Sequence, residues 1–402
     1  MQKYTLKNKI TLIFDRKSSD SVTICVTVKV GSNNETKKIL GISHFLEHMV
    51  FEGTKNRANS TIIANEIERL GGELNAYTSN ERTTFYIKVQ KKHFDIALDI
   101  ISDITQNPLF KDKSIEKERN IILKEINMVT DEPRFHQWVL FTQTLFKTHP
   151  SKYPAYGTIK TVKGITKKDL QNYFKKYYVP NNMIISVVGG ISDPKEKIER
   201  AFSKIKPGPI KELTTEEPQQ TTIQKTIEKK KILNSYMVLG YKTPIRLHKD
   251  SYTLDIIKAL LARGQSGKIV EEIRSKRGLA YEVNVYHDPN KDFGTFAVYL
   301  NTDKKNIKKA IGIILNEFDK LKNITTEELD DAKGFLEGSY ILEKEDTRHT
   351  ADELNFWEMI KDSSLNQAYL SKIKSITKKD IKETAKRYLT KNYTLAVIEQ
   401  TN

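Results

Sequence analysis

The chain has 402 residues, and 67 Lys and Arg against 51 Asp and Glu give it a formal net charge of +16. Its length predicts two or three domains, and 38% hydrophobic with 9% aromatic residues provide for large buried cores, which excludes wholesale disorder. No segment approaches the roughly 20 apolar residues of a membrane-spanning helix, and the first residues lack the apolar core of a signal peptide. Unless a leader has been removed, we expect a cytoplasmic protein without membrane association.

The basic charge does not indicate a nucleic-acid-binding protein. Lysines are spread along the chain beside acidic residues, as at residues 378–380, which is typical of solvated helix faces. The one purely basic run, residues 229–231, is not interleaved with aromatic residues that could stack on bases. Cys25 is the only cysteine, so internal disulfides and Cys-rich metal sites are excluded. Any metal must therefore be held by His and carboxylate side chains.

A strand and a helix are the first patterned segments. Residues 21–30 form an apolar, β-branched run that predicts a strand. His44-Phe-Leu-Glu47-His48 follows, with Ser43 near the start of the expected helix and Gly53 near its end. On a helix, His44 and His48 lie one turn apart on one face with Glu47 close by. This is the mirror order of the His-Glu-x-x-His zinc-protease helix, in which two His bind the metal and the Glu is the general base.

The histidine motif has an ordinary alternative. A pair of His on a solvated helix face would show the same spacing. A catalytic zinc also needs three protein ligands and an open position, so two His are too few.

The next segment predicts a hairpin. Residues 71–78 and 83–89 have the pattern of two strands, and the first of them could form a sheet edge. An exposed edge can pair with an extended peptide through main-chain hydrogen bonds. Gly71-Gly72 is equally well explained as a helix end followed by a turn.

Two amphipathic helices are expected at residues 92–104 and 114–129. The second carries Glu118 and Glu125, which are about two turns apart and therefore share a face. One could complete a metal site while the other supports it. A solvated stripe of glutamates would give the same pattern.

The sequence repeats itself. The segment that starts Ile165-Thr-Lys-Lys-Asp recurs as Ile376-Thr-Lys-Lys-Asp, and both copies begin as a capped helix and end in a β-branched strand. The register of the repeat pairs Tyr177 with Tyr388 and Asn181 with Asn392. Residues 206–222, between the copies, are rich in Pro and polar residues and predict a linker. We therefore expect domains at residues 1–205 and 223–402.

The fold class follows from these elements. Further strands are expected at residues 184–188, 236–241, 295–300 and 394–398, and a further helix at residues 327–342. They predict an α+β fold of two similar domains from an internal duplication. Each domain is expected to be a largely antiparallel sheet with helices packed on one face.

The motifs together resemble a known family. Glu125 follows the second His of His44-x-x-Glu47-His48 by 77 positions, and Glu118 precedes it by seven. This pattern, with residues 51–54 (Phe-Glu-Gly-Thr) and 71–78 (Gly-Gly-Glu-Leu-Asn-Ala-Tyr-Thr), resembles the inverzincin peptidases of the pitrilysin/insulinase family and the mitochondrial processing peptidase. The likeness spans essentially the whole chain and is strongest to the two-domain bacterial members.

The resemblance implies roles for residues of the first domain. His44, His48 and Glu125 would bind one Zn²⁺ per chain, and Glu47 would act as general base. Glu118 would not bind the metal itself but would orient a ligand through a hydrogen bond. Asn75 and Ala76 correspond to positions that bind the substrate strand in relatives.

The resemblance also implies how the second domain takes part. Arg274 and Tyr281 match an Arg and a Tyr, seven apart, that reach the substrate at the zinc in relatives; by themselves they are an unremarkable helix end. The second domain has no His-x-x-Glu-His motif and is expected to be a catalytically silent copy. Because single-chain relatives carry four such domains, two chains are expected to form a clamshell homodimer, or a heterodimer with a related chain.

The sequence thus predicts a zinc metalloendopeptidase that hydrolyses extended or unfolded peptides in a closed chamber, and no nucleic-acid partner. The alternative is a non-catalytic peptide-binding or assembly subunit of a heterodimeric processing peptidase. The intact His44, Glu47, His48 and Glu125 favour the enzyme, since silent family members commonly lose one or more of these residues.

Overall fold

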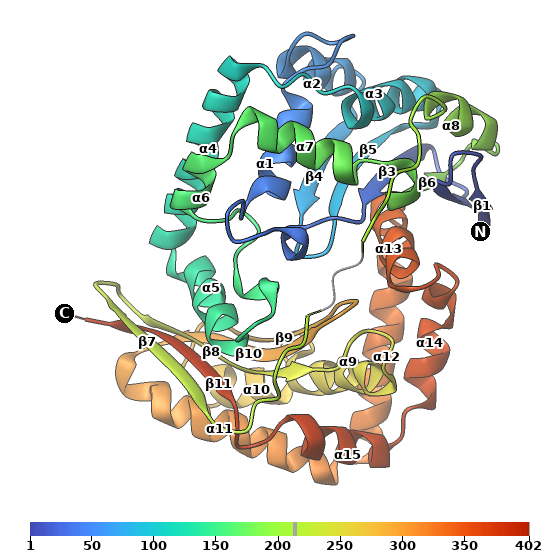
Figure 1. Cartoon of the computed structure of the whole chain (residues 1–402). Coiled ribbons are helices and arrows are strands. Elements are labelled where there is room, and N and C mark those ends of the chain that lie inside the picture. The colour runs from blue at the N-terminus through green and yellow to red at the C-terminus, as the bar shows by residue number, and fades with distance from the viewer. Residues whose placement is uncertain (212–214, 402) are drawn as a thin grey trace. The chain divides into compact units, whose positions relative to one another are not determined.

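A computed structural model describes residues 1–211 and 215–401 (Figure 1). The contacts divide the chain into two compact units. The first consists of Met1–Asn127, Tyr153–Leu213 and Leu342–Asn366, and the second of Met128–Lys152, Thr214–Ile341 and Gln367–Asn402. None of the described helices is both long enough and apolar enough to cross a lipid bilayer.

The first unit is built on a six-stranded sheet in the order β1-β2-β6-β3-β5-β4. All neighbouring strands are antiparallel except β2 and β6, which are parallel. Strand β4 forms one edge and pairs with β5 in the register Ala76 to Phe85. The strands are β1 (Gln2–Thr5), β2 (Thr11–Arg16), β3 (Ser21–Val28), β4 (Glu73–Thr78), β5 (Thr83–Gln90) and β6 (Met183–Gly189).

Helices cover this sheet because its central strands carry apolar side chains on one face and a smaller apolar core with buried hydroxyls, such as Thr23 and Thr27, on the other. Ile24 of β3 belongs to the larger core, to which several helices contribute, whereas its neighbour Cys25 faces a smaller core on the other side. The helices of the unit are α1 (Ile42–Phe51), α2 (Ser60–Glu68), α3 (Phe94–Gln106), most of α4 (Asp112–Asp131), α6 (Ile159–Gly164), α7 (Lys167–Tyr177), α8 (Lys195–Ala201) and α13 (Thr347–Ile360).

The second unit repeats the plan with a five-stranded sheet in the order β7-β11-β8-β10-β9. Its one parallel pair is β7 with β11. The strands are β7 (Gln224–Lys230), β8 (Ser235–Thr243), β9 (Val283–Pro289), β10 (Gly294–Thr302) and β11 (Thr394–Gln400). The helices are α5 (Pro133–Leu145), α9 (Lys249–Ala262), α10 (Lys268–Val270), α11 (Ile307–Lys320), most of α12 (Thr326–Glu343), most of α14 (Leu365–Ser375) and α15 (Lys378–Tyr388).

The duplicated segments start with the same cap. The Thr166 side chain accepts a hydrogen bond from the N–H of Asp169 at the start of α7, and Thr377 does so from Asp380 at the start of α15. In both helices the Asp side chain also accepts a hydrogen bond from the N–H of the Thr, so each pair of contacts satisfies backbone N–H groups that a helix end leaves unpaired. The capping boxes expected from the repeat are therefore present.

Each sheet receives one helix from the other half of the chain. Leu354 and Ile360 of α13 pack on the face of the first sheet that carries Cys25, and Figure 1 shows this late, red-coloured helix beside β3 and β6. Conversely, Phe141 of α5 packs on Val238 of the second sheet. Each sheet is thus covered on both faces.

The fold class is confirmed: two sheets, each packed with helices, form two similar units. The expectation that helices lie on one face of each sheet was incomplete, because α13 covers the second face of the first sheet and α5 does so in the second. The division at residues 206–222 stays a prediction, because the compact units exchange α5 and α13 and so do not follow the halves of the sequence. Residues 206–211 and 215–222 contain no helix or strand, and residues 212–214 of the expected linker lie outside the described residues.

Candidate metal centre

Helix α1 positions the His motif. Its apolar side chains, among them Phe45 and Met49, are fully buried in the first core and fix the helix against the sheet. Gly41, at the start of the helix, has φ +93, a left-handed conformation that favours glycine. The buried Glu35 carboxylate accepts hydrogen bonds from the N–H groups of Gly41 at 2.6 Å and Ser43 at 2.8 Å. The backbone immediately before His44 is therefore held by a side chain.

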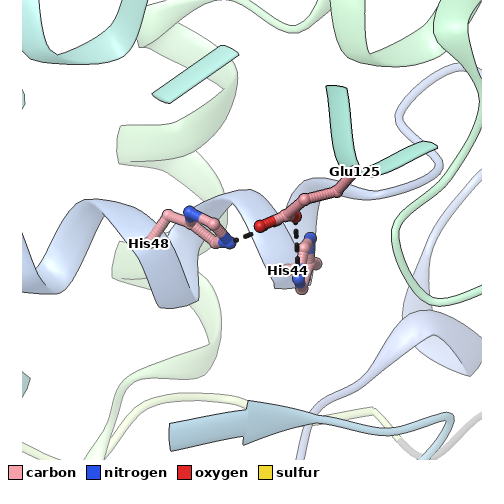
Figure 2. A group of neighbouring side chains, drawn as sticks. All are labelled: His44, His48 and Glu125. Atoms are coloured by element: carbon pink, nitrogen blue, oxygen red, sulfur yellow. Dashed lines mark ion pairs between the residues drawn. The ribbon is translucent and has the colours of Figure 1, made fainter. Parts of the chain in front are cut away.

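His44, His48 and Glu125 lie together (Figure 2). The two imidazoles project from α1 towards the carboxylate of Glu125, which comes from α4. Glu125 Oε2 is 3.9 Å from His44 Nε2 and 3.7 Å from His48 Nε2. One donor atom from each of the three residues lies within 4.8 Å of the others. Within residues 1–211 and 215–401, no other group of three such side chains meets this criterion.

Glu118 fixes the orientation of His48. Its carboxylate is 2.9 Å from His48 Nδ1 and lies 3.1 Å from the ammonium of Lys117. Burial raises the pKa of Glu118, but the hydrogen bonds from His48 and Lys117 lower it more, so its pKa is below the usual value. The ionised carboxylate accepts the Nδ1 proton and so directs Nε2 of His48 towards Glu125. Burial lowers the pKa of His48, but the Glu118 hydrogen bond and the nearby carboxylates raise it more, so a metal ion would have to displace the proton of Nε2.

His44 has the properties of a neutral ligand. Burial, together with the nearby His48, lowers its pKa to about 3. Its Nδ1 is buried without a hydrogen-bond partner in the described part of the chain, so, unlike His48, it has no protein partner that fixes its tautomer.

This donor set fits zinc. Two neutral imidazole nitrogens and one carboxylate oxygen are a common ligand set of catalytic Zn²⁺, which keeps its fourth position open. The carboxylate of Glu118 behind His48 is the kind of partner that metal-binding imidazoles usually have. The residues present therefore fit the metal that the sequence predicts, and their assignment as ligands stays a prediction.

Glu47 faces a different partner. The hydroxyl of Thr78, the last residue of β4, donates a hydrogen bond of 2.5 Å to Glu47 Oε2. Burial raises the pKa of Glu47 above its usual value, although this hydrogen bond and His48 lower it in part. A carboxylate with a raised pKa beside a metal site is suited to accept and return a proton.

Asn75 and Ala76 lie on β4, the edge strand. In the described sheet, β4 pairs only with β5, so its outer edge is unpaired. The N–H of Ala76 donates to Asn75 Oδ1 at 2.8 Å. The strand that ends at the Glu47 contact thus presents main-chain groups along an open edge.

Arg274 and Tyr281 belong to the second unit. Arg274 lies in a π-helical turn, Glu271–Ser275, and its guanidinium is 5.1 Å from the centre of the Tyr281 ring. The Tyr281 side chain is 82% exposed. These two residues contact each other. Their expected role stays a prediction.

Sequence reasoning missed Glu35 and Thr78. Glu35 gives no signal, because a capping carboxylate seven residues before the first residue of the helix depends on the loop conformation. Thr78 gives a weak signal: a hydroxyl at the end of an expected edge strand, within the segment that carries Asn75 and Ala76.

The fold and the site together define a two-unit architecture with one His-His-Glu donor set, and comparisons with known proteins identify its class. Residues 11–159 match the family model "Insulinase (Peptidase family M16)", and residues 164–336 match "Peptidase M16 inactive domain". The chain belongs to the insulinase family, peptidase family M16, and is zinc-protease-like.

Similar proteins support this assignment. An uncharacterized zinc protease of Bacillus subtilis, YmxG, is 30% identical over 99% of this chain and 98% of its own length. An uncharacterized zinc protease of Rickettsia felis is 32% identical over 87% of this chain and 85% of its own length. The crystal structure of a protease from Helicobacter pylori has a TM-score of 0.93 and 26% identity, with 99% of each chain covered.

Proposed function

We propose that the protein is a zinc-dependent endopeptidase that hydrolyses extended or unfolded peptides. The observation that carries the proposal is the meeting of His44, His48 and Glu125, with the partly buried carboxylate of Glu47 on the same helix as both histidines. The zinc-protease names of the relatives agree with this chemistry.

In this proposal each residue has a separate task. His44, His48 and Glu125 would hold Zn²⁺, which when bound supplies a Lewis acid that acidifies water to a pKa of about 7 and polarises a peptide carbonyl. Glu47 takes the proton of the attacking water and gives it to the leaving amine. Glu118 holds His48 in the tautomer that presents Nε2.

The open edge of β4 supports the choice of substrate. An extended peptide that adds to this edge would form main-chain hydrogen bonds beside Asn75 and Ala76, which requires no particular side chains. A folded protein has no free strand to offer. We therefore propose unfolded peptides as substrates.

The second unit would serve the active site of a partner chain. We propose a homodimer in which Arg274 and Tyr281 of one chain reach the metal centre of the other. The guanidinium would hold a substrate carbonyl, and the phenol would donate to the developing oxyanion. The 82% exposure of Tyr281 leaves its ring available for such a contact.

The test of the proposed function combines metal analysis with peptide cleavage. Purified protein should contain about one Zn²⁺ per chain and should cleave a mixed peptide library, with products measured by mass. Glu47→Gln should retain the metal and lose cleavage, because the water is still acidified but no base takes its proton. The exposed Glu116→Gln, on α4, is the control and should change neither.

The alternative is a non-catalytic subunit that binds peptides or assembles a complex. The match of residues 164–336 to an inactive-domain model favours a silent second half. The residues of the metal centre precede the matched segment, so this match does not bear on them. Peptide binding without cleavage in a zinc-loaded protein would support this alternative and contradict the peptidase.

A further inference from the structure

The second unit contains a pocket of about 590 Å³ that the proposed peptidase does not use. It lies where β8 ends and β11 begins, and its walls come from several separate segments of the unit. They include Phe146, His149, Tyr241, Thr243, Phe293 and Asn392.

Two residues that line the pocket each have a buried polar atom without a hydrogen-bond partner in the described part of the chain, His149 Nε2 and Thr243 Oγ1. His149 is 1% exposed, and its Nδ1 accepts a hydrogen bond from the N–H of Ser151 at 3.2 Å. Its Nε2 lies 3.5 Å from Asp292 Oδ2 without forming a hydrogen bond. Unused polar atoms of this kind are costly in a buried wall unless a ligand or water bonds them.

The Lys and the Arg that line the pocket already form ion pairs. Lys242 forms an ion pair with Glu217, whose carboxylate also accepts the N–H groups of residues 147–149. Arg387 forms an ion pair with Asp250. The pocket therefore does not select an anion such as phosphate, and its unused groups suit a neutral, hydrogen-bonding ligand.

The internal repeat contains an analogous contact in the first unit. In the first unit, the carboxamide of Asn181 binds the backbone of Gly208 twice: Nδ2 donates to the carbonyl at 2.8 Å, and Oδ1 accepts the N–H at 2.9 Å. Asn392, which lines the pocket, is the counterpart of Asn181 in the repeat. Asn392 is exposed, and within the described residues its carboxamide forms no hydrogen bond. It is free to make the same two contacts.

The repeat also predicts the residue that fits. A Cβ on Gly208 would lie 3.0 Å from Cγ1 of Val179, which is closer than side-chain contacts ordinarily are. The counterpart of Val179 is Thr390, another β-branched residue, and it lines the pocket. A bound peptide should therefore need glycine at the position opposite Asn392.

The remaining walls suit proline. The Phe293 ring lies 5.7 Å from Phe146 and 5.1 Å from His149, measured between ring centres. Aromatic walls bind proline-containing extended segments, whose conformation is preformed. Gly208 is itself flanked by Pro207 and Pro209.

We propose that this pocket is a second peptide-binding site, which takes an extended Pro-Gly-Pro segment of a polypeptide. The Asn392 carboxamide holds the glycine backbone at both its N–H and its carbonyl. His149 Nε2 and the Thr243 hydroxyl bond further backbone groups. The site does not depend on the metal or on Glu47.

The test is a ligand-observed NMR titration of the full chain with acetyl-Lys-Pro-Gly-Pro-Ile-amide, the sequence of residues 206–210. The peptide should bind saturably, with the same affinity in the presence and absence of a zinc chelator. Replacing its glycine by alanine should weaken binding about tenfold or more. Asn392→Leu should weaken binding about tenfold, because two hydrogen bonds are lost.

Matched variants make the result decisive. Asn323→Leu changes an exposed asparagine of the same unit outside the pocket and should leave the affinity unchanged. Asn392→Asp keeps the shape and the acceptor but lacks the N–H donor, so it should also weaken binding if Asn392→Leu fails to fold. Absence of saturable binding, or equal affinity of the Asn392 variants and the unchanged protein, would overturn the proposal. If peptide binding is lost when zinc is chelated but is unaffected by the Asn392 substitutions, the peptide binds at the metal centre instead.

Discussion

Thr78 and Glu47 join the open edge strand of the first sheet to the carboxylate beside the metal centre, through a hydrogen bond of 2.5 Å. The Thr78 hydroxyl donates in this hydrogen bond, which opposes the rise in the pKa of Glu47 that burial causes. The hydroxyl of Thr83 lies 3.5 Å from the hydroxyl of Thr78, and it donates its own proton to the carbonyl of Val30. A peptide that binds along β4 would therefore lie on the strand that also orients the proposed base.

This relationship predicts that Thr78→Val slows peptide hydrolysis. A hydrogen bond to a charged group contributes about 1.5–3 kcal/mol, so kcat should fall roughly 10- to 100-fold. Because Thr78 is not expected to bind the peptide itself, KM should change much less. Steady-state kinetics on one fluorogenic peptide would measure both constants.

Thr78→Ser is the matched control for this prediction. It keeps the hydroxyl and should restore most of kcat. Equal losses in the Ser and Val variants would show that the hydroxyl is not what matters, and a change confined to KM would assign Thr78 to peptide binding.

Glu118 gives a second prediction, on metal affinity. Glu118→Gln removes the charge that holds the Nδ1 proton of His48. The zinc affinity should then fall about 10- to 100-fold, as is usual when such a supporting carboxylate is lost. Competition with a chromophoric chelator measures this affinity without any reference to peptidase activity.

Glu125→Ala is the positive control and Glu116→Gln the negative control of this experiment. The first removes a proposed ligand and should abolish zinc binding, whereas the second changes an exposed glutamate that pairs with Arg119 and should have no effect. Unchanged affinity in Glu118→Gln would mean that His48 does not need this partner.

The sequence predicted the elements of the metal centre because helical periodicity is local. Spacing within residues 44–48 and between Glu118 and Glu125 fixes which side chains share a helix face, and the structure places them accordingly. That α1 and α4 meet at this point came from the family resemblance, since no local pattern determines which two helices face each other.

The exchange of α5 and α13 could not be predicted from the sequence. Both helices follow a long helix of their own half, and an apolar face such as that of Leu354 and Ile360 would fit either sheet. Tertiary packing decides which sheet each helix covers. Buried polar contacts across this interface, such as Asn355 Nδ2 donating to the carbonyl of Cys25 at 3.2 Å, specify one sheet, and such long-range pairs leave no trace in periodicity.

Glu217 gives a prediction on pH. Burial raises its pKa, but the backbone N–H of Lys147 and the ammonium of Lys242 lower it more, to about 2. Because the folded pKa lies below the unfolded value of 4.5, the stabilisation is fully present above pH 4.5 and is lost as the pH falls towards 2. Glu217→Gln should therefore cost roughly 1–2 kcal/mol at pH 7, and the difference from the unchanged protein should shrink below pH 4.5.

Calorimetric unfolding of the full chain at several pH values would measure this difference. The neighbouring Glu216→Gln is the control, because among residues 1–211 and 215–401 only its backbone carbonyl accepts a hydrogen bond, from the hydroxyl of Thr148. A pH-independent difference for Glu217→Gln would show that packing, and not the ionised carboxylate, provides the stabilisation.

The last prediction concerns the proposed exchange of catalytic groups between two chains. Glu47→Gln lacks the base, and the double variant Arg274→Ala with Tyr281→Phe lacks the groups that would hold the carbonyl and the oxyanion. Each homodimer should be inactive. In a mixed dimer, the intact metal centre of the double variant meets the intact Arg274 and Tyr281 of the Glu47→Gln chain, so one complete site is restored.

Mixing the two inactive proteins should therefore recover up to about half of the activity per mixed dimer, since one of its two sites is complete. Native mass spectrometry confirms subunit exchange before activity is measured, and the double variant should contain normal zinc because its ligands are unchanged. Recovery requires donation in trans, because neither chain carries a full set of groups. Demonstrated mixed dimers without recovered activity would place Arg274 and Tyr281 in the same chain's site or outside catalysis, and a protein that stays monomeric while active would exclude the shared site altogether.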